Sequence, residues 1–311
     1  MRKTLLNLLR VGVTAVGLAI VATQVDVRQI GQSLSRARPS WVLAGFLLIN
    51  ASLVVRAYRW HILLRGLGSE HSFRRLVELY FVGNFFNIAL PSAFGGDVVR
   101  TLEATEEVPA SVATGTVLLD RLTGLVMLFV MAVLMLPFEG QHTPAGLTWF
   151  LVAGAVLGVT GIFILVDGRA MARLGRGLPS FITTSKWTRP IRLLIEAVRA
   201  CGWHAVLGGL GISAVFNLML VGWWLTSGWA LGQQVPFSYY LLIMPALSLP
   251  LLLPSISGLG PRELIAPTLF AAVGIAGSTA VSTSLLVFAI TRISGLLGAP
   301  VYLSMVWRKR G

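Results

Sequence analysis

The sequence predicts an all-α polytopic membrane protein with about six full spans and two re-entrant, broken-helix hairpins arranged as an inverted repeat. Three observations carry this prediction. Hydrophobic residues make up 55% of the 311 residues and charged residues only 12%, whereas soluble domains carry about 25% charged residues. Several apolar runs reach the ~20 residues that cross a bilayer as a helix, and two others are interrupted by proline and glycine. An ordinary soluble enzyme, a disordered protein and a disulfide-stapled secreted domain are thereby excluded.

The six uninterrupted apolar runs define the full spans. We treat the whole chain, 1–311, as one membrane domain, in which 167–204 forms a basic connector between the fourth and fifth spans. This connector is either an amphipathic segment lying on anionic headgroups or a plain solvated linker. The predicted spans are 4–24, 41–64, 111–136, 145–166, 205–231 and 279–305.

Two further apolar stretches, 76–90 and 238–253, each end at a break. Proline removes a backbone donor and glycine weakens a helix, so neither stretch continues straight on. A broken helix at membrane depth is tolerated only where protein or a wet cavity satisfies the freed backbone groups. Each stretch is therefore expected to form half of a re-entrant hairpin, the alternative being a short span followed by a surface loop. The breaks contain Pro91, Gly95 and Gly96 in the first case, and Pro254, Gly258 and Gly260 in the second.

The two breaks resemble each other and predict an internal duplication. Leu90-Pro91-Ser92 is followed by Gly95, and Leu253-Pro254-Ser255 is followed by Gly258 at the same spacing. Further on, Asp120-Arg121 with Gly124 resembles Thr291-Arg292 with Gly295. The repeat halves are 76–136 and 238–305. Three spans separate the hairpins, so the second copy would enter from the opposite side, as in the inverted repeats of transporters.

The charge distribution predicts the orientation. Lys+Arg total 25 against 12 Asp+Glu, a net charge of +13, and most cations flank apolar runs, which favours membrane topology over nucleic-acid binding. By the positive-inside rule both termini are expected to be cytoplasmic. The predicted cytoplasmic side carries Arg65, Arg74, Arg75, the arginines of 169–199 and the tail Arg308-Lys309-Arg310, whereas the other side carries Arg28, Arg36 and Arg38.

Ionisable residues inside spans are costly and therefore indicate either a binding site or structural pairing. Arg121 and Arg292 occupy the repeated position, and for them we favour substrate binding. Arg56 and Arg59 are explained equally well by snorkelling. The remaining candidates for substrate binding lie beside the breaks or beside Arg121: Asp97, Arg100, Asp120, Asn87, Arg262, Glu263, Ser255 and Ser257.

The breaks also create helix starts that suit an anion. Asp97 is expected to be the N-cap of the helix after the first break, and Pro261 the first residue of the helix after the second. Free N–H groups at such ends favour a phosphate or carboxylate. The amides of Asn84 and Asn87 either join this site or bond between helices. The single cysteine and the four histidines show no metal-ligand spacing, no catalytic motif is found, and no cofactor or metal is expected.

The ordered motifs resemble those of the lysylphosphatidylglycerol synthase transmembrane (flippase-like) family, also called the UPF0104 group. The resemblance implies an integral inner-membrane protein concerned with envelope lipids. In the best-known relatives this domain is fused to an aminoacyltransferase and is credited with moving aminoacylated phosphatidylglycerol between leaflets. The synthase half is expected to be absent here, so no synthase activity is implied. The motifs are Arg59-Trp60 with Leu63-Leu64, Asn87 with Leu90-Pro91, Gly95-Gly96-Asp97 with Arg100, Asp120-Arg121 with Gly124, and Gly258 with Gly260-Pro261-Arg262-Glu263.

The leading hypothesis is a flippase or scramblase-like transporter of an anionic or phosphate-bearing lipid, such as an anionic phospholipid or a polyprenyl phosphate. One alternative is a non-transporting membrane partner of an envelope-lipid synthase. Another is an intramembrane lipid-modifying enzyme that uses Asp97, Asp120 or Glu263.

Overall fold

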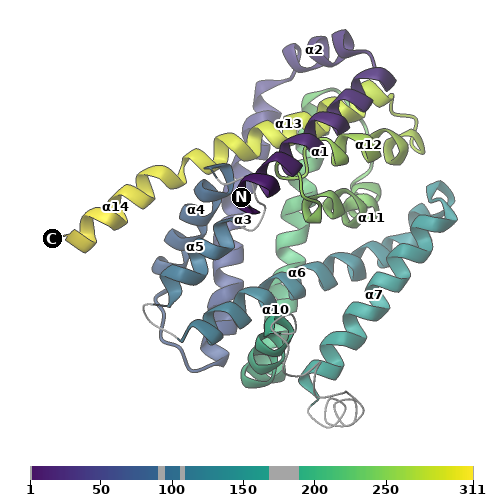
Figure 1. The fold of residues 1–311 in the computed structure, drawn as a ribbon. Helices are drawn as coiled ribbons and strands as arrows, with labels where there is room; N and C mark the ends of the chain where they lie inside the picture. Colours follow the sequence, from purple (N-terminus) through teal and green to yellow (C-terminus); the bar gives the residue numbers. More distant parts are fainter. Residues whose placement is uncertain (1, 90–94, 106–108, 168–188, 311) are drawn as a thin grey trace.

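The computed structural model describes residues 2–89, 95–105, 109–167 and 189–310, and these form helices joined by turns, with no strand among them (Figure 1). The α-helices are α1 (Arg2–Gln24), α2 (Val27–Ser35), α3 (Pro39–Gly66), α4 (Phe73–Ala89), α5 (Gly95–Ala104), α6 (Ala110–Glu139), α7 (Ala145–Val166), α10 (Arg189–Ala230), α11 (Phe237–Ser248), α12 (Pro261–Ala271), α13 (Gly277–Leu296) and α14 (Gly298–Arg310). Two short 3₁₀ turns, η1 (Gly140–His142) and η3 (Leu249–Leu252), complete the described elements.

Five of the six predicted full spans are confirmed as long apolar helices. Within the described residues, five helices are long and apolar enough to cross a membrane: α3, α6, α7, the part of α10 over Leu193–Ala230, and α13 continued by α14 over Gly277–Arg308. The first predicted span, 4–24, corresponds to α1, which meets the same criterion only when Leu8–Gln24 is joined to α2 across a bend of 95°. The protein is therefore an all-helical, multi-pass membrane protein.

The last part of the connector predicted over 167–204 is helical in the structure. From Arg189 the chain is already helical and belongs to α10, and Gly202, with φ 71°, interrupts the helical backbone. Ala197, Val198 and Cys201 are buried with apolar residues of α3 and α6. A plain linker would expose these side chains, so burial explains why the helix starts early. The part of the connector over 168–188 lies outside the described residues.

Close approach between small residues joins the central helices. A Cβ on Gly66 would lie 2.6 Å from the Cβ of Ala205, and a Cβ on Gly115 would lie 2.5 Å from the carbonyl oxygen of Leu193. Glycine at these points lets α10 pack directly on α3 and α6, as small residues do between membrane helices. At the opposite end of α3, the Arg38 amide donates to the Ala230 carbonyl over 2.9 Å. We call these two ends of the bundle the Gly66 end and the Arg38 end.

The first hairpin, α4 and α5, begins and ends at the Gly66 end. Near the start of α4, the Arg75 guanidinium lies 3.0 Å from the carboxylate of Glu103, which is near the end of α5. At the start of α5, a Cβ on Gly96 would lie 2.2 Å from the carbonyl oxygen of Gly83, so the two helices touch through backbone. Pro91 and its neighbours 90–94 lie outside the described residues.

The second hairpin, α11 and α12, begins and ends at the Arg38 end. Gly232 before it and Ala276 after it line one cavity together with Arg38. At its break, α11 and η3 give way to a turn containing Pro254. This turn has positive φ at Ser257 (53°), Gly258 (81°) and Gly260 (91°) before α12 begins at Pro261. Glycine fits these backbone angles without the cost of a Cβ, which explains its place in the break.

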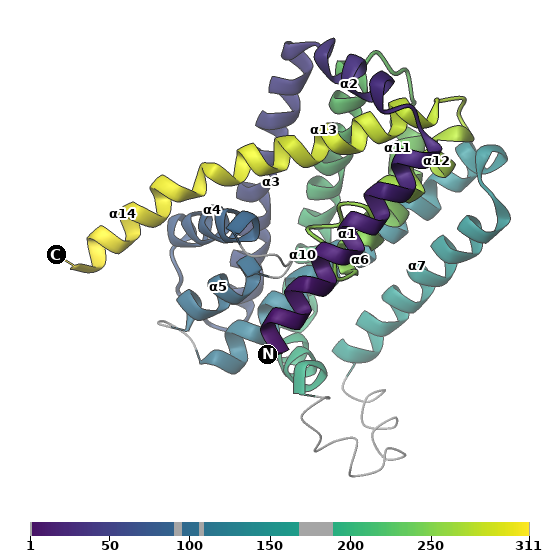
Figure 2. The same cartoon turned by 45° about the horizontal axis from the view of Figure 1, so that its top comes forward.

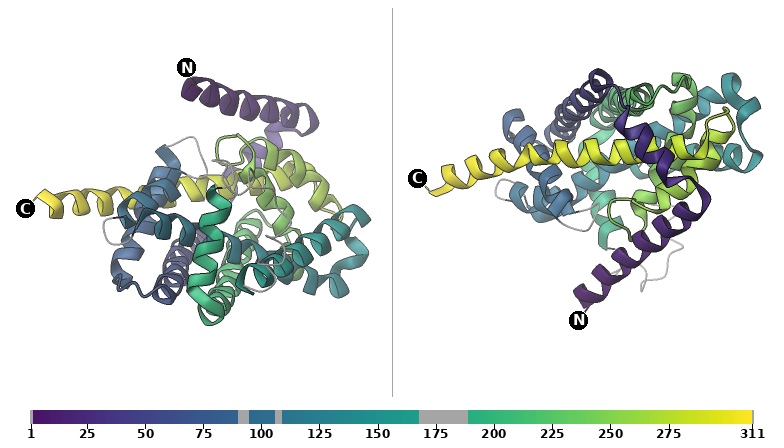
Figure 3. Two further views of the ribbon diagram at one scale, coloured as in Figure 1. Left: turned by 60° about the horizontal axis from the view of Figure 1, so that its bottom comes forward. Right: turned by 90° about the horizontal axis from the view of Figure 1, so that it is seen from above.

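The two hairpins lie on opposite sides of α10 and enter from opposite ends (Figures 1 and 2). The long rod of α13 and α14 crosses the molecule, and α1 lies along its outside (Figure 3). This is the placement that an inverted repeat requires. A two-fold relation between 76–136 and 238–305 stays a prediction.

Candidate functional site

Asp120, on α6, lies at the centre of a buried ionic cluster against the first hairpin. Its carboxylate accepts hydrogen bonds from Arg59 Nε and from the Tyr80 hydroxyl, both over 2.6 Å. Arg100 Nη1 lies 3.8 Å from the same carboxylate. Arg59 also donates to Ser213 on α10 over 3.0 Å. One acid on α6 therefore joins α3, α4 and α5.

Asp97, on α5, forms the second acid of the cluster. It pairs with Arg100 one turn later on the same helix and with Arg121 on α6. The predicted role of Asp97 as an N-cap is wrong, because α5 already begins at Gly95 and Asp97 lies inside its first turn. Asn87 of α4 takes part in the capping instead, since its side-chain oxygen accepts from the Gly96 amide over 2.7 Å.

The cluster contains more positive than negative charge. Four arginines (Arg56, Arg59, Arg100 and Arg121) face the two carboxylates of Asp97 and Asp120, an excess of two positive charges. Cation–π contacts stabilise two of these arginines. Arg100 lies 4.0 Å from the centre of the Tyr80 ring, and Arg56 lies 5.1 Å from the same ring. Among the described residues, Arg56 has no hydrogen bond or ion pair. An excess cation in an apolar surrounding favours an additional anion.

Arg292, the partner of Arg121 in the predicted repeat, lies at the end of α4. Its Nη1 donates to the carbonyls of Asn87 and Ile88 over 3.3 and 3.4 Å. Its guanidinium lies 4.5 Å from the centre of the Phe288 ring. Its Nη2 is buried and has no hydrogen-bond acceptor among the residues that the structure describes.

The two repeated arginines thus meet the same hairpin at its tip. Arg292 contacts the last turn of α4 through Asn87, whereas Arg121 contacts the first turn of α5 through Asp97. Asn87 is itself bonded to Gly96, the residue before Asp97. Asn84 also lies here and donates to Ser294 of α13 over 3.2 Å. Both amides therefore make interhelical bonds, which is the alternative that the sequence left open.

The residues beside the second break form an internally paired group. Arg262 donates to the hydroxyl of Ser284 over 2.8 Å and lies 3.4 Å from Glu263. Glu263 accepts from Ser284 over 2.6 Å and from the Gly260 amide over 2.7 Å, which caps α12. Pro261 is the first residue of α12, as predicted. The structure therefore brings Arg262 and Glu263 to each other rather than to Arg121.

The two serines of the second break, Ser255 and Ser257, belong to the turn that precedes α12. Ser255 accepts from the Gly258 amide over 3.1 Å, and the amide of Ile256 donates to Thr14 of α1 over 3.0 Å. Ser257 takes the positive φ described above. A Cβ on Gly260 would lie 2.9 Å from the Thr14 carbonyl, so α1 packs closely on this break.

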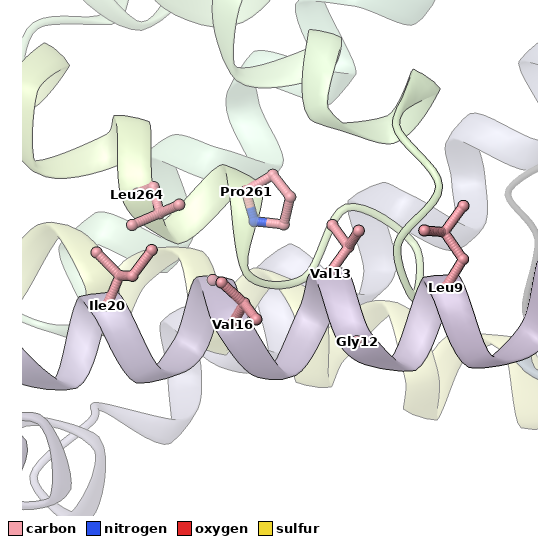
Figure 4. Close-up of a pocket in the computed structure, with 8 residues that line it drawn as sticks. Leu9, Gly12, Val13, Val16, Ile20, Pro261 and Leu264 are labelled. Atoms are coloured by element: carbon pink, nitrogen blue, oxygen red, sulfur yellow. The ribbon is translucent and has the colours of Figure 1, made fainter.

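An apolar groove lies between α1 and α12. It has a volume of about 420 Å³, and in Figure 4 the α1 side chains Leu9, Val13 and Val16 stand along one wall with Pro261 and Leu264 opposite. Gly12 also lines the groove, and a Cβ there would meet nothing within 4 Å. The groove suits a hydrocarbon chain rather than a polar ligand.

Residues 7–298 match the family described as the lysylphosphatidylglycerol synthase TM region. The chain belongs to this family. It is also 25% identical to the UPF0104 membrane protein PH1989 of Pyrococcus horikoshii, over 92% of each chain. Over 33% of this chain and 32% of the other, it is 31% identical to the UPF0104 membrane protein MJ1595 of Methanocaldococcus jannaschii. Family membership confirms a multi-pass membrane protein, whereas the inner membrane and cytoplasmic termini stay predictions.

Sequence reasoning missed three members of the site. The sequence does not decide the role of Arg59 and contains no signal for Tyr80 or Ser213, although all three bond within the Asp120 cluster. Their partners are distant in sequence, so no local spacing pointed to them. The described residues contain no group of three His, Cys, Asp or Glu side chains placed to hold a metal ion.

Proposed function

We propose that this protein moves an anionic or phosphate-bearing lipid between the two leaflets of its membrane, as a flippase or scramblase-like transporter. Family membership supports a lipid-related membrane role. The two hairpins, which enter from opposite ends, would each form a gate on one side of a shared path. The apolar groove between α1 and α12 supports a substrate with hydrocarbon chains.

The observation that carries the proposal is the convergence of Arg121 and Arg292 on the tip of the first hairpin. Arg292 Nη2 is buried without an acceptor in the described part of the chain, and an unsatisfied buried donor is costly. A phosphate oxygen is a strong acceptor for a guanidinium and would relieve this cost. The excess of two positive charges in the adjoining cluster would offset the charge of a phosphate as it leaves water.

The proposal includes no chemical step. Asp97, Asp120 and Glu263, the acids that an intramembrane enzyme would use, are each engaged by an arginine or by a helix-capping bond. A carboxylate held in this way is poorly placed to act as a general base. In this proposal, movement is downhill or coupled to an ion gradient.

The test is reconstitution of the full chain in liposomes containing fluorescent phosphatidylglycerol, phosphatidylcholine or a polyprenyl phosphate. Transbilayer movement is followed by dithionite quenching for the two labelled phospholipids. We expect faster movement of an anionic lipid than of phosphatidylcholine, with at least a tenfold loss in Arg292→Gln. Arg28→Gln, which removes an exposed arginine from α2, is the matched control and should keep the wild-type rate. The absence of protein-dependent movement for every lipid, with and without an ion gradient, would refute transport.

A further inference from the structure

A second cavity, at the Arg38 end, has the composition of an anion site. It has a volume of about 420 Å³, within the ~300–1,000 Å³ typical of ligand pockets. Its wall is formed by α2, by the start of α3, by the end of α10 and by the start of α13. The polar side chains on this wall belong to Gln29, Gln32, Ser33, Arg36, Arg38, Ser278 and Thr279.

The charge in this cavity is entirely positive. Arg36 and Arg38, both exposed, line it, and no carboxylate of the described residues does. Neither guanidinium has a hydrogen bond or an ion pair with any described residue. Asp26, the acid on the same helical segment, is the N-cap of α2, where its side chain accepts from the amides of Arg28 and Gln29. Two guanidiniums therefore face one polar cavity without a counter-charge.

Backbone and side-chain bonds hold the walls of this cavity in place. The Arg38 amide donates to the carbonyl of Ala230 over 2.9 Å, which fixes the start of α3 on the end of α10. The Ser278 hydroxyl donates to the Gln29 side chain over 2.9 Å, which fixes α13 on α2. The cavity is thus assembled from four helices, and its arginines are carried on the short turn between α2 and α3.

The position of these arginines is unusual for the side of the membrane on which the Arg38 end is predicted to lie. The positive-inside rule depletes translocated loops of cations. The loops over 137–144 and 232–237, at the same end of the bundle, contain no Lys or Arg. In the orientation that the charge distribution predicts, Arg36 and Arg38 lie on the side that the rule disfavours, which points to a local use for their charge.

We propose that the cavity at the Arg38 end binds the phosphate of an anionic headgroup or of a soluble phosphate ester. Two guanidiniums suit the oxygens of a phosphate, and the amide side chains of Gln29 and Gln32 would bond neighbouring hydroxyls. The cavity adjoins both ends of the second hairpin, so a lipid bound here would lie at the entrance of the proposed transport path. That role in transport rests on the proposed function, whereas binding itself does not.

The experiment measures binding by isothermal titration of the full chain in phosphatidylcholine nanodiscs. Glycerol 3-phosphate and dihexanoyl phosphatidylglycerol are the probes, and dihexanoyl phosphatidylcholine is the zwitterionic control. We expect R36Q/R38Q to weaken the binding of at least one anionic probe tenfold or more. R28Q removes a neighbouring arginine that does not line the cavity. The affinity of this variant for the anionic probes should stay within twofold of the wild-type affinity. S33W, which fills the cavity but keeps both arginines, should also weaken binding.

The outcomes separate the sources of the phosphate and the two proposals. Equal affinity for both anionic probes would support a soluble phosphate ester, whereas binding of the lipid alone would support a headgroup. No binding of either probe to the wild type, an unchanged affinity in R36Q/R38Q, an equal loss in R28Q or an unaffected S33W would each overturn the site. If the wild-type protein binds an anionic probe in nanodiscs but moves no lipid in liposomes, only the transport proposal is refuted.

Discussion

Replacing Asp120 by asparagine should destabilise the fold, because this carboxylate connects α6 to three other helices. Asp120 is fully buried, and its partner Arg59 is 3% exposed at the side chain. Asparagine retains the shape but loses the charge. The four arginines of the cluster would then face one carboxylate instead of two, in an environment where the excess charge has little access to water.

The size of the effect follows from the burial of the pair. Removing one partner of a buried ion pair costs about 3–5 kcal/mol. For a chain of this size, about 2 °C of Tm accompanies each kcal/mol, so the expected loss is about 6–10 °C. Exposed pairs are worth much less. Arg74→Gln, whose side chain is 84% exposed, is the control and should leave Tm within about 1 °C.

The assay is thermal unfolding of the purified protein in detergent, followed by intrinsic tryptophan fluorescence. The double variant Arg59→Gln with Asp120→Asn removes both charges, so its loss of Tm should be smaller than the sum of the two single losses. An Asp120→Asn variant within about 2 °C of the wild type, or strictly additive single losses, would refute the interpretation of this cluster as a coupled buried pair.

Three further predictions concern the two hairpins. Gly96→Ala would place a Cβ 2.2 Å from a carbonyl oxygen of α4, so Tm should fall by several degrees; an unchanged Tm would contradict the backbone contact within the first hairpin. Gly17→Ala meets the backbone of the second break at 2.8 Å whereas Gly12→Ala meets nothing within 4 Å, so only the former should lower Tm, and equal effects would argue against the packing of α1. Glu263→Gln weakens the cap of α12, so hydrogen exchange should accelerate in the first turn of that helix; unaltered exchange there would contradict the capping role.

The spans and the breaks were predictable because they depend on local properties of the chain. A run of ~20 apolar residues has few alternatives to a membrane helix, and proline followed by glycine stops a helix. Pro261 was correctly placed at the first position of α12 because proline fits there whatever surrounds it. Glu263 stands at the third position of this helix, from which a glutamate can accept from the backbone amide at the N-cap, so its bond to Gly260 was also open to prediction.

The contents of the ionic cluster were not predictable, because they depend on helices that meet only in the folded protein. Arg59 and Asp120 are 61 residues apart, and Arg292 and Asn87 are 205 apart. Asp97 was expected to cap α5 because aspartate is a good cap. Asn87 lies on another helix, and its bond to Gly96 lets α5 start earlier. A single sequence contains no local signal for such a contact.

The central claim is that the tip of the first hairpin, between Arg121 and Arg292, receives the lipid headgroup. The most direct measurement is photo-crosslinking of reconstituted protein with phosphatidylglycerol that carries a diazirine in its headgroup, followed by peptide mapping. The account predicts adducts on the end of α4, the start of α5 and the turn of α6 around Arg121, which excess unlabelled phosphatidylglycerol removes and Arg292→Gln reduces. Adducts confined to the exposed faces of α7 and α14, with none at the hairpin tip, would contradict it.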